Sequence, residues 1–471
     1  MSNANRFIKS SAVYFVGNVL TKVISFVLLP MFTIYISTED MGYYDLSVSY
    51  LNILVPVIGM EVWSAFLRYM FDFENNEDKY RVIFNGMVIF SGSTLVYCLL
   101  FAVLGIVTDV RCLILIFFYG WFTILQNIYS FVARGLGFNT TFAVSGIISS
   151  LVNSVSNIVM VIGLNMRLES LYIAYILGHI AQILILESKV KIFRHLSFKL
   201  LDKQLLVSML KYSLPLSLNS AAFWFLSSYN KVGVANILGL ENNGIYSVAG
   251  KFTAALTLIS TCFSMAWQEL VYSKGNETDK SDFYTSASNY YIKFLMVGLL
   301  LLVPVVQVVF PFMVVGEGYK SAFEFIPLYL LATVASIYSN FLGNIFGAEK
   351  KTGVILFSTL VAAAVNVTVL HSLIGTLGVQ AANISLFCGF IVNIVIRIVL
   401  LNKTAKIRLD YKFILLSFLL FGTAFVIYMY NNIWMNIGFA VLVAVFGLIL
   451  FKPFIQRGLN VVKSKLGKAK G

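Results

Sequence analysis

Four cationic side chains interrupt otherwise apolar stretches of this sequence: Lys22, Arg68, Lys231 and Lys251. An ionisable group inside a bilayer costs at least a few kcal/mol unless it faces a watery cavity or a partner. Lys22 and Lys251 fall near the middle of their apolar segments, whereas Lys231 and Arg68 fall nearer to segment ends. We therefore predict that these cations line a cavity that attracts an anionic substrate.

Two acids, Glu61 and Glu269, lie within long apolar segments, each close to a tryptophan. Each is a candidate for coupling transport to a proton or sodium gradient. A structural interpretation competes with this functional one. In it, Lys22 and Glu61 form an ion pair inside the protein, and Lys231 and Arg68 extend their charged ends to the membrane surfaces.

Indole and amide side chains also lie deep in apolar segments. Trp63, Trp224 and Trp267 are candidates for stacking on sugar rings, although tryptophan also serves as a packing or membrane-interface residue. Asn153 and Asn366 occupy similar places in two different segments. Their amides suit either sugar hydroxyls or hydrogen bonds between helices.

Catalytic and metal-binding motifs are missing from the sequence. There is no phosphate loop, no HExxH and no GxSxG, so we expect neither ATP hydrolysis nor another enzymatic reaction in this chain. The 4 cysteines are isolated in apolar stretches, and His179 and His371 are solitary. We expect no disulfide framework, no metal and no cofactor.

The composition is that of a membrane protein, with 59% hydrophobic and only 12% charged residues in 471 positions. Apolar segments of bilayer-spanning length number about fourteen. We therefore predict an all-α, polytopic membrane protein with about 14 transmembrane helices.

Lysine and arginine gather on one side of the predicted membrane. If the N-terminus is cytoplasmic, the opposite side keeps only Arg111, Arg167 and Lys320. This bias predicts that both termini are cytoplasmic, and it assigns Lys293 and Arg397 to anchoring at the cytoplasmic surface. The net charge of +13 then comes mostly from the basic residues that orient the chain in the membrane, and it does not indicate nucleic-acid binding. The loops expected on the outer side are short, which argues against a membrane polymerase or transferase.

The two halves of the chain carry a repeated motif. Glu39-x-x-Gly42-x-Tyr44 follows the first apolar segment, and Glu241-x-x-Gly244-x-Tyr246 follows the seventh. This repeat predicts two parallel six-helix units related by an axis along the membrane normal. The expected divisions are an N-terminal lobe at 1–190, a basic cytoplasmic linker at 191–210, a C-terminal lobe at 211–402, two additional helices at 403–455 and a basic cytoplasmic tail at 456–471.

Several motifs together resemble the polysaccharide flippases, the O-antigen and teichoic-acid export branch of the MATE-like multidrug/oligosaccharidyl-lipid/polysaccharide exporter superfamily. They are Leu29-Pro30, the Glu39 motif, Gly59 followed by Arg68, Tyr212-Ser213-Leu214-Pro215, the run from Gly244 to Lys251, Ala266-Trp267, and Gly375-x-x-Gly378. The resemblance covers about residues 8–402. One departure is Asn230-Lys231, where the family leads us to expect an acid before the cation.

This resemblance implies a two-lobe MATE-like fold and a function in the bacterial cytoplasmic (inner) membrane. The expected function is to flip undecaprenyl-pyrophosphate-linked oligosaccharides by alternating access for O-antigen, lipopolysaccharide or similar surface polysaccharide. The expected partners are the lipid-linked substrate, membrane lipids, H⁺ or Na⁺, and a polysaccharide polymerase with a chain-length regulator. A MATE-type cation or drug antiporter, a lipid II flippase and a membrane polymerase or transferase are the alternatives.

Overall fold

The computed structural model describes residues 26–73, 75–273, 281–349, 351–403 and 407–468. Every regular element in these ranges is helical, as expected for an all-α membrane protein. The α-helices are α2 (Leu29–Tyr35), α3 (Thr38–Ile58), α4 (Val62–Met70), α5 (Asn76–Val107), α6 (Leu113–Gly135), α7 (Asn139–Ile158), α8 (Leu168–Val190), α9 (Lys203–Ser227), α10 (Tyr229–Leu238), α11 (Leu240–Lys251), α12 (Ala254–Ser273), α13 (Ser281–Met313), α14 (Ala322–Ala348), α15 (Thr352–Leu377), α16 (Gln380–Asn402), α17 (Tyr411–Met429) and α18 (Ile433–Lys468). Short helical segments of other kinds are η1 (Val159–Gly163), η2 (Ile192–His195), η3 (Phe198–Leu200) and η4 (Glu317–Tyr319).

Ten of the described helices are long and apolar enough to span a membrane, and counting the bent pair α3 and α4 raises the number to eleven. The chain is therefore a multi-pass membrane protein. The expected seventh and eighth spans fall on the interrupted pairs α9 with α10 and α11 with α12. The expected first span lies mostly outside the described residues, so the total of fourteen stays a prediction.

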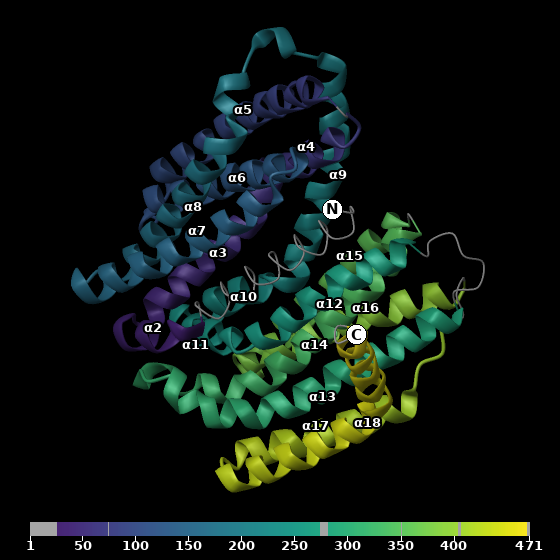
Figure 1. Ribbon diagram of the computed structural model, residues 1–471. Helices are drawn as coiled ribbons and strands as arrows, with labels where there is room; N and C mark the ends of the chain where they lie inside the picture. The colour runs from purple at the N-terminus through teal and green to yellow at the C-terminus, as the bar shows by residue number, and fades with distance from the viewer. Residues whose placement is uncertain (1–25, 74, 274–280, 350, 404–406, 469–471) are drawn as a thin grey trace.

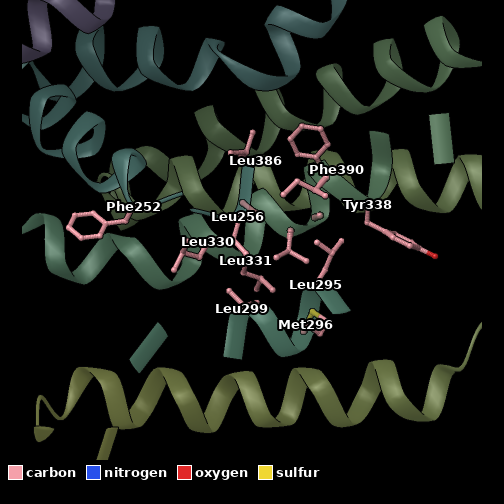
Figure 2. Packing of buried hydrophobic residues seen from close by; sticks show 14 of the residues in the cluster. Phe252, Leu256, Leu295, Met296, Leu299, Leu330, Leu331, Tyr338, Leu386 and Phe390 are labelled. Carbon is pink, nitrogen blue, oxygen red and sulfur yellow. The ribbon is translucent and has the colours of Figure 1, made fainter. Parts of the chain in front are cut away.

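Figure 1 shows the helices in two bundles, the first formed by α3 to α8 and the second by α10 to α18, and α9 packs on both, on α3 and α4 of the first and on α15 of the second. Each bundle has a buried apolar cluster of its own, because helices that are apolar on most sides pack against one another away from the lipid. Figure 2 shows part of the second cluster, with Leu256, Leu330 and Phe390 among its labelled residues. Helices α17 and α18 both pack on α13, along the outer side of the second bundle (Figure 1). The expected domain boundaries stay a prediction.

The two bundles meet where α3 and α11 run side by side. A Cβ atom added to Gly42 would lie 1.8 Å from the carbonyl oxygen of Leu240, and one added to Gly244 would lie 1.9 Å from that of Thr38. The two glycines hold equivalent positions in the repeated Glu-x-x-Gly-x-Tyr motif, so the contact is nearly symmetric. Only glycine allows two backbones to approach this closely.

The loop between α13 and α14 reinforces this contact. The hydroxyl of Tyr319 donates a hydrogen bond to the carbonyl oxygen of Ser37 at 2.8 Å. A Cβ atom added to Gly316 would lie 1.8 Å from the carbonyl oxygen of Thr33. We call this end of the molecule the closed end. The opposite end of the first bundle, where residues 191–202 join α8 to α9, is the linker end.

Candidate functional site

A cavity of about 510 Å³ lies in the first bundle. Its walls come from α3, α4, α6, α8 and α9, and the break between α3 and α4 opens into it. Amide, hydroxyl and aromatic side chains alternate on the walls, a mixture that suits a polar ligand with sugar rings. The lining residues are Leu51, Asn52, Val55, Pro56, Glu61, Trp63, Tyr119, Thr123, Asn127, Tyr175, Asn219, Ser220, Phe223, Trp224, Ser227 and Ser228.

Glu61 lies at the break, where α3 and α4 meet at an angle of 48°. Met60 and Glu61 both have left-handed backbone conformations, with φ of 49° and 45°. Such a conformation costs a non-glycine residue on the order of 1–3 kcal/mol and concentrates at functional sites. Oε1 of Glu61 accepts a hydrogen bond from the hydroxyl of Ser220 at 3.0 Å. The break therefore presents a carboxyl group to the cavity.

The three candidate tryptophans have different surroundings. Trp63 and Trp224 both line the cavity, and Nε1 of Trp224 donates a hydrogen bond to the carbonyl oxygen of Ser49 at 2.6 Å. Trp267 is buried in the second bundle, where its ring stacks on Phe341 and its Nε1 donates to the Phe341 carbonyl at 3.2 Å. Only the first two tryptophans border the space available to a ligand.

The two candidate asparagines lie outside the cavity lining. The side-chain oxygen of Asn153 accepts a hydrogen bond from Asn157, one helical turn away, at 2.7 Å. Asn366 is fully buried and donates to the side chain of Asn230 at 2.8 Å and to the carbonyl of Phe225 at 3.0 Å. Asn366 thereby satisfies a carbonyl group near the interruption between α9 and α10. These contacts are structural in this conformation.

An ion pair joins the two bundles near the closed end. Nζ of Lys231 on α10 lies 2.9 Å from Oδ1 of Asp45 on α3, and the two side chains are 26% and 10% exposed. Oδ2 of Asp45 is buried and has no hydrogen-bond partner among the described residues. Asp45 lies one helical turn beyond Gly42, so the ion pair and the glycine contact are neighbours.

Lys251 adds an uncompensated positive charge to this pair. It ends α11 and interacts electrostatically with both Asp45 and Lys231. Its side chain is exposed. It forms no ion pair with any residue that the structure describes. We call Asp45, Lys231 and Lys251 the charge cluster; its formal charge is positive.

Arg68 lies apart from the charge cluster. It ends α4, and its guanidinium pairs with Asp72 at 2.5 Å, with both side chains about half exposed. This placement matches the surface interpretation of Arg68 better than a place in the cavity. Lys22 lies outside the described residues, as does the side chain of Glu269. The suggested ion pair between Lys22 and Glu61 therefore stays a hypothesis.

Arg397 differs from the expectation that it anchors the chain at a membrane surface. Its side chain is only 3% exposed, and its guanidinium donates hydrogen bonds to the Ser339 carbonyl at 2.5 Å and to the Ser358 hydroxyl at 3.0 Å. Anchoring at the surface is therefore wrong for this residue. Arg397 on α16 connects this helix to α14 and α15 inside the second bundle. Buried hydroxyl and carbonyl oxygens on those two helices accept its hydrogen bonds.

Metal-ligating side chains do not gather anywhere in the described ranges. His179 is packed edge-on against Tyr175, with ring centroids 4.1 Å apart. Nε2 of His371 lies 2.9 Å from the hydroxyl of Tyr229. Both histidines therefore lie against tyrosine side chains.

With this geometry in view, the comparison with protein families is direct. Residues 7–268 match the family model described as polysaccharide biosynthesis protein, which is more than half of the chain. The chain belongs to this family. No curated protein matches its sequence.

Solved structures with the same fold are membrane transporters. The polysaccharide biosynthesis protein superposes on a lipid II flippase MurJ in an inward closed conformation with a TM-score of 0.72, at 15% identity, over 95% of this chain and 100% of that one. An inward-facing MATE family transporter of the MOP superfamily gives 0.63 at 15% identity, over 84% and 96%. An outward-facing MATE family transporter gives 0.54 at 16% identity, over 82% and 93%. The fold of this family member is thus MurJ-like and MATE-like.

Asp45 is the site residue that sequence reasoning missed in this polysaccharide biosynthesis protein. It lies only a few residues inside the second apolar segment, where an acid is easily taken for part of the preceding loop. The available signal was its place directly after the repeated motif that ends at Tyr44. The cavity amides Asn127 and Asn219 lie in apolar helices, but nothing in their spacing brings them together.

Proposed function

We propose that this protein flips a lipid-linked oligosaccharide that carries a pyrophosphate, across the bacterial cytoplasmic membrane, for the synthesis of a surface polysaccharide. The charge cluster is the observation that carries this proposal. Lys231 pairs with Asp45 and Lys251 adds a second positive charge, so the cluster has a net positive charge for an anion. Membership of the polysaccharide biosynthesis family supports a sugar-bearing substrate.

The cavity in the first bundle suits the sugar part of such a substrate. On α3, Asn52 in the cavity wall lies seven residues beyond Asp45, which is about 10 Å along a helix. A pyrophosphate at the charge cluster would therefore place the first sugars beside the cavity amides and Trp224. The prenyl chain would stay in the lipid, because burying it in a polar cavity would lose its favourable contact with hydrocarbon.

Transport would proceed by alternating access, with the two bundles rocking about the bound headgroup. The contacts at the closed end support an inward-facing state if this end is extracytoplasmic, as the distribution of basic residues predicts. The TM-score is higher against the inward-facing transporter than against the outward-facing one, in agreement with an inward-facing state. Both termini would then be cytoplasmic.

Glu61 is our candidate for coupling to a proton or sodium gradient. It is a carboxyl group on the cavity wall, at a strained break in a membrane-spanning segment. Broken helices in transporters commonly hold their coupling ions. From their places in the sequence alone, we add Glu269 to the proposed coupling site and Lys22 to the proposed substrate site.

Lipid II is the second candidate substrate, because the MurJ fold matches over nearly the whole chain. It shares the prenyl pyrophosphate and differs in its sugars and peptide, so the charge cluster suits both substrates. A cation or drug antiporter fits less well, since the cluster has more cationic than anionic side chains. Catalysis is not part of the proposal.

Deletion of the gene in its host tests the proposal. We expect lipid-linked repeat units to accumulate on the cytoplasmic face and surface polysaccharide to disappear, while peptidoglycan synthesis continues. Complementation with Lys22→Ala plus Lys251→Ala should leave the defect, whereas the conservative Lys251→Arg should restore export. A deletion strain that keeps its polysaccharide and instead stops peptidoglycan synthesis would favour lipid II.

A further inference from the structure

A second cavity, of about 410 Å³, lies at the linker end of the first bundle. Its walls come from the start of α5, the turn after α6, the end of α8 and η2. At the other end of α8, Arg167 donates a hydrogen bond to the Tyr35 carbonyl beside the closed end. Helix α8 therefore runs the length of the bundle and brings the cavity to the opposite side. The lining residues are Tyr80, Leu136, Phe138, Lys189, Val190, Lys191, Arg194 and His195.

The cavity lining is cationic and contains no acid. Lys189, Lys191 and Arg194 are all exposed, and none forms an ion pair with a described residue. The neighbouring acid, Glu187, is engaged elsewhere, because it accepts hydrogen bonds from the backbone N–H groups of Ile192 at 2.9 Å and of the next residue. Three cations thus line the cavity against the neighbouring carboxylate of Glu187, so the site keeps a net positive charge.

The backbone of this site is held in place. The rings of Tyr80 and His195 stack with centroids 3.8 Å apart, and Nδ1 of His195 donates to the Lys191 carbonyl at 2.9 Å. Further along the linker, Asn85 on α5 donates to the Leu200 carbonyl at 2.9 Å and accepts from the Asp202 N–H at 2.9 Å. A preformed site of this kind loses less entropy when a ligand binds.

Apolar side chains stand beside the cations and face outward. Phe193 is 66% exposed and Phe198 is 87% exposed, on the two short helical segments that follow α8. The 23 residues of α8 span about 34 Å, which is the thickness of the hydrocarbon core and a little more. The end of α8 therefore lies at headgroup depth, where aromatic and basic residues anchor proteins.

We infer that this cavity binds the phosphate of an anionic phospholipid headgroup, while Phe193 and Phe198 contact the acyl chains. Charge complementarity favours a phosphate, and the exposed rings favour a lipid over a soluble phosphate, which would leave them in water. Because the linker is fixed to α5, a bound lipid would hold the first bundle at a set depth while the second bundle moves. This site is separate from the charge cluster.

Lipid binding by the purified full-length protein in detergent tests the inference, with dioleoyl phosphatidylglycerol as the probe. Lys189→Gln with Arg194→Gln should weaken binding by about thirty-fold, because each basic residue near the surface contributes about a factor of five. The matched control is Lys203→Gln with Lys403→Gln, which removes the same charge from exposed sites outside the cavity and should change binding by less than about two-fold.

Two further experiments show whether the bound phosphate belongs to a lipid or to a soluble molecule. Phe193→Ser with Phe198→Ser should weaken binding of phosphatidylglycerol but leave binding of glycerol 3-phosphate unchanged. Phosphatidylcholine should compete poorly with phosphatidylglycerol. The inference is overturned if the control pair weakens binding as much as the cavity pair, or if glycerol 3-phosphate binds as tightly as the lipid.

Discussion

At the scale of single residues, the ion pair between Lys231 and Asp45 is one of the contacts that connect the two bundles. Lys231→Met should lower the apparent melting temperature, because buried Asp45 loses its ion-pair partner, at a cost of about 3 kcal/mol. The double variant Lys231→Met with Asp45→Leu should recover most of this loss. Thermal unfolding of the detergent-solubilised protein measures these variants and Asp45→Leu alone, and a loss in the double variant equal to the sum of the two single losses would mean that the pair is not coupled.

Arg397 carries a prediction about stability alone. Arg397→Met should destabilise the second bundle by about 3 kcal/mol, because the carbonyl of Ser339 and the hydroxyl of Ser358 lose their donor in a buried site. The exposed Lys403, on the same helix end, is the control, and Lys403→Met should have little effect. A transport defect in Arg397→Met without a lower melting temperature would contradict the structural assignment.

Asp410 gives a pH dependence outside the membrane-spanning segments. It caps α17, where its side chain accepts a hydrogen bond from the Phe413 N–H, and it pairs with Lys293 at 2.7 Å. Lys293, with this backbone hydrogen bond, lowers the pKa of the Asp410 carboxyl. Stability from the ionised carboxyl is therefore complete above the unfolded pKa of about 4 and is lost as pH falls through the lower folded value.

Asp410→Asn tests this dependence, because asparagine also caps helices but has no charge. The melting temperature of the variant should lie below that of the unmodified protein at pH 7. The gap should be small, since Asp410 is 36% exposed, and it should close as pH falls well below about 4. A gap of the same size at pH 7 and at pH 3 would show that the charge contributes nothing.

Residue types alone indicated which side chains were candidates, but their partners depend on contacts between distant segments. Lys231 and Lys251 were predictable as cations within membrane-spanning segments because each interrupts an apolar run. Their counter-charge, Asp45, lies 186 residues from Lys231 along the chain, so no local pattern connects the two. The burial of Arg397 was unpredictable for the same reason, since its hydroxyl partners lie on two other helices.

At the scale of elements, the contact between α3 and α11 determines whether the closed end stays closed. Gly42→Ala should separate the two helices, because the new methyl group would clash with the Leu240 carbonyl. Spin labels at positions 39 and 241, the equivalent exposed acids of the repeated motif, report this distance. We expect the distance distribution to shift to larger values in Gly42→Ala.

Gly92→Ala on α5 is the control for this measurement, because a Cβ atom there meets nothing within 4 Å. It should leave the distance between positions 39 and 241 unchanged. An unchanged distance in Gly42→Ala as well would mean that backbone approach at the glycines does not hold the closed end together.

Helix breaks were the feature of the elements that the sequence predicted least well. Apolar length predicts single spans over 42–70 and 242–272, whereas the structure breaks them into α3 with α4 and α11 with α12. The first break follows Gly59 and includes two left-handed residues, Met60 and Glu61. Hydropathy averages over such interruptions, so it finds the span but not the kink that turns Glu61 to the cavity.

At the scale of the whole molecule, the repeated motif predicted two parallel units, and the contact between Gly42 and Gly244 joins the equivalent positions of the motif, which the sequence alone did not predict. The fold class was predictable because long apolar segments with few charges cross a bilayer as helices, which satisfy their own backbone hydrogen bonds. The identity of the substrate was not predictable, since several lipid-linked sugars share the phosphate that we propose as the ligand of the charge cluster.

The central claim is that the charge cluster carries the anionic headgroup of a lipid-linked oligosaccharide through the membrane. The most direct measurement is flipping of a labelled undecaprenyl-pyrophosphate-linked oligosaccharide in liposomes that contain the purified protein. We predict flipping by the unmodified protein, at least ten-fold slower flipping by Lys251→Ala, and near-normal flipping by Lys251→Arg. Equal rates in liposomes with the unmodified protein and with Lys251→Ala would contradict the claim, as would transport of a cationic dye in place of the oligosaccharide.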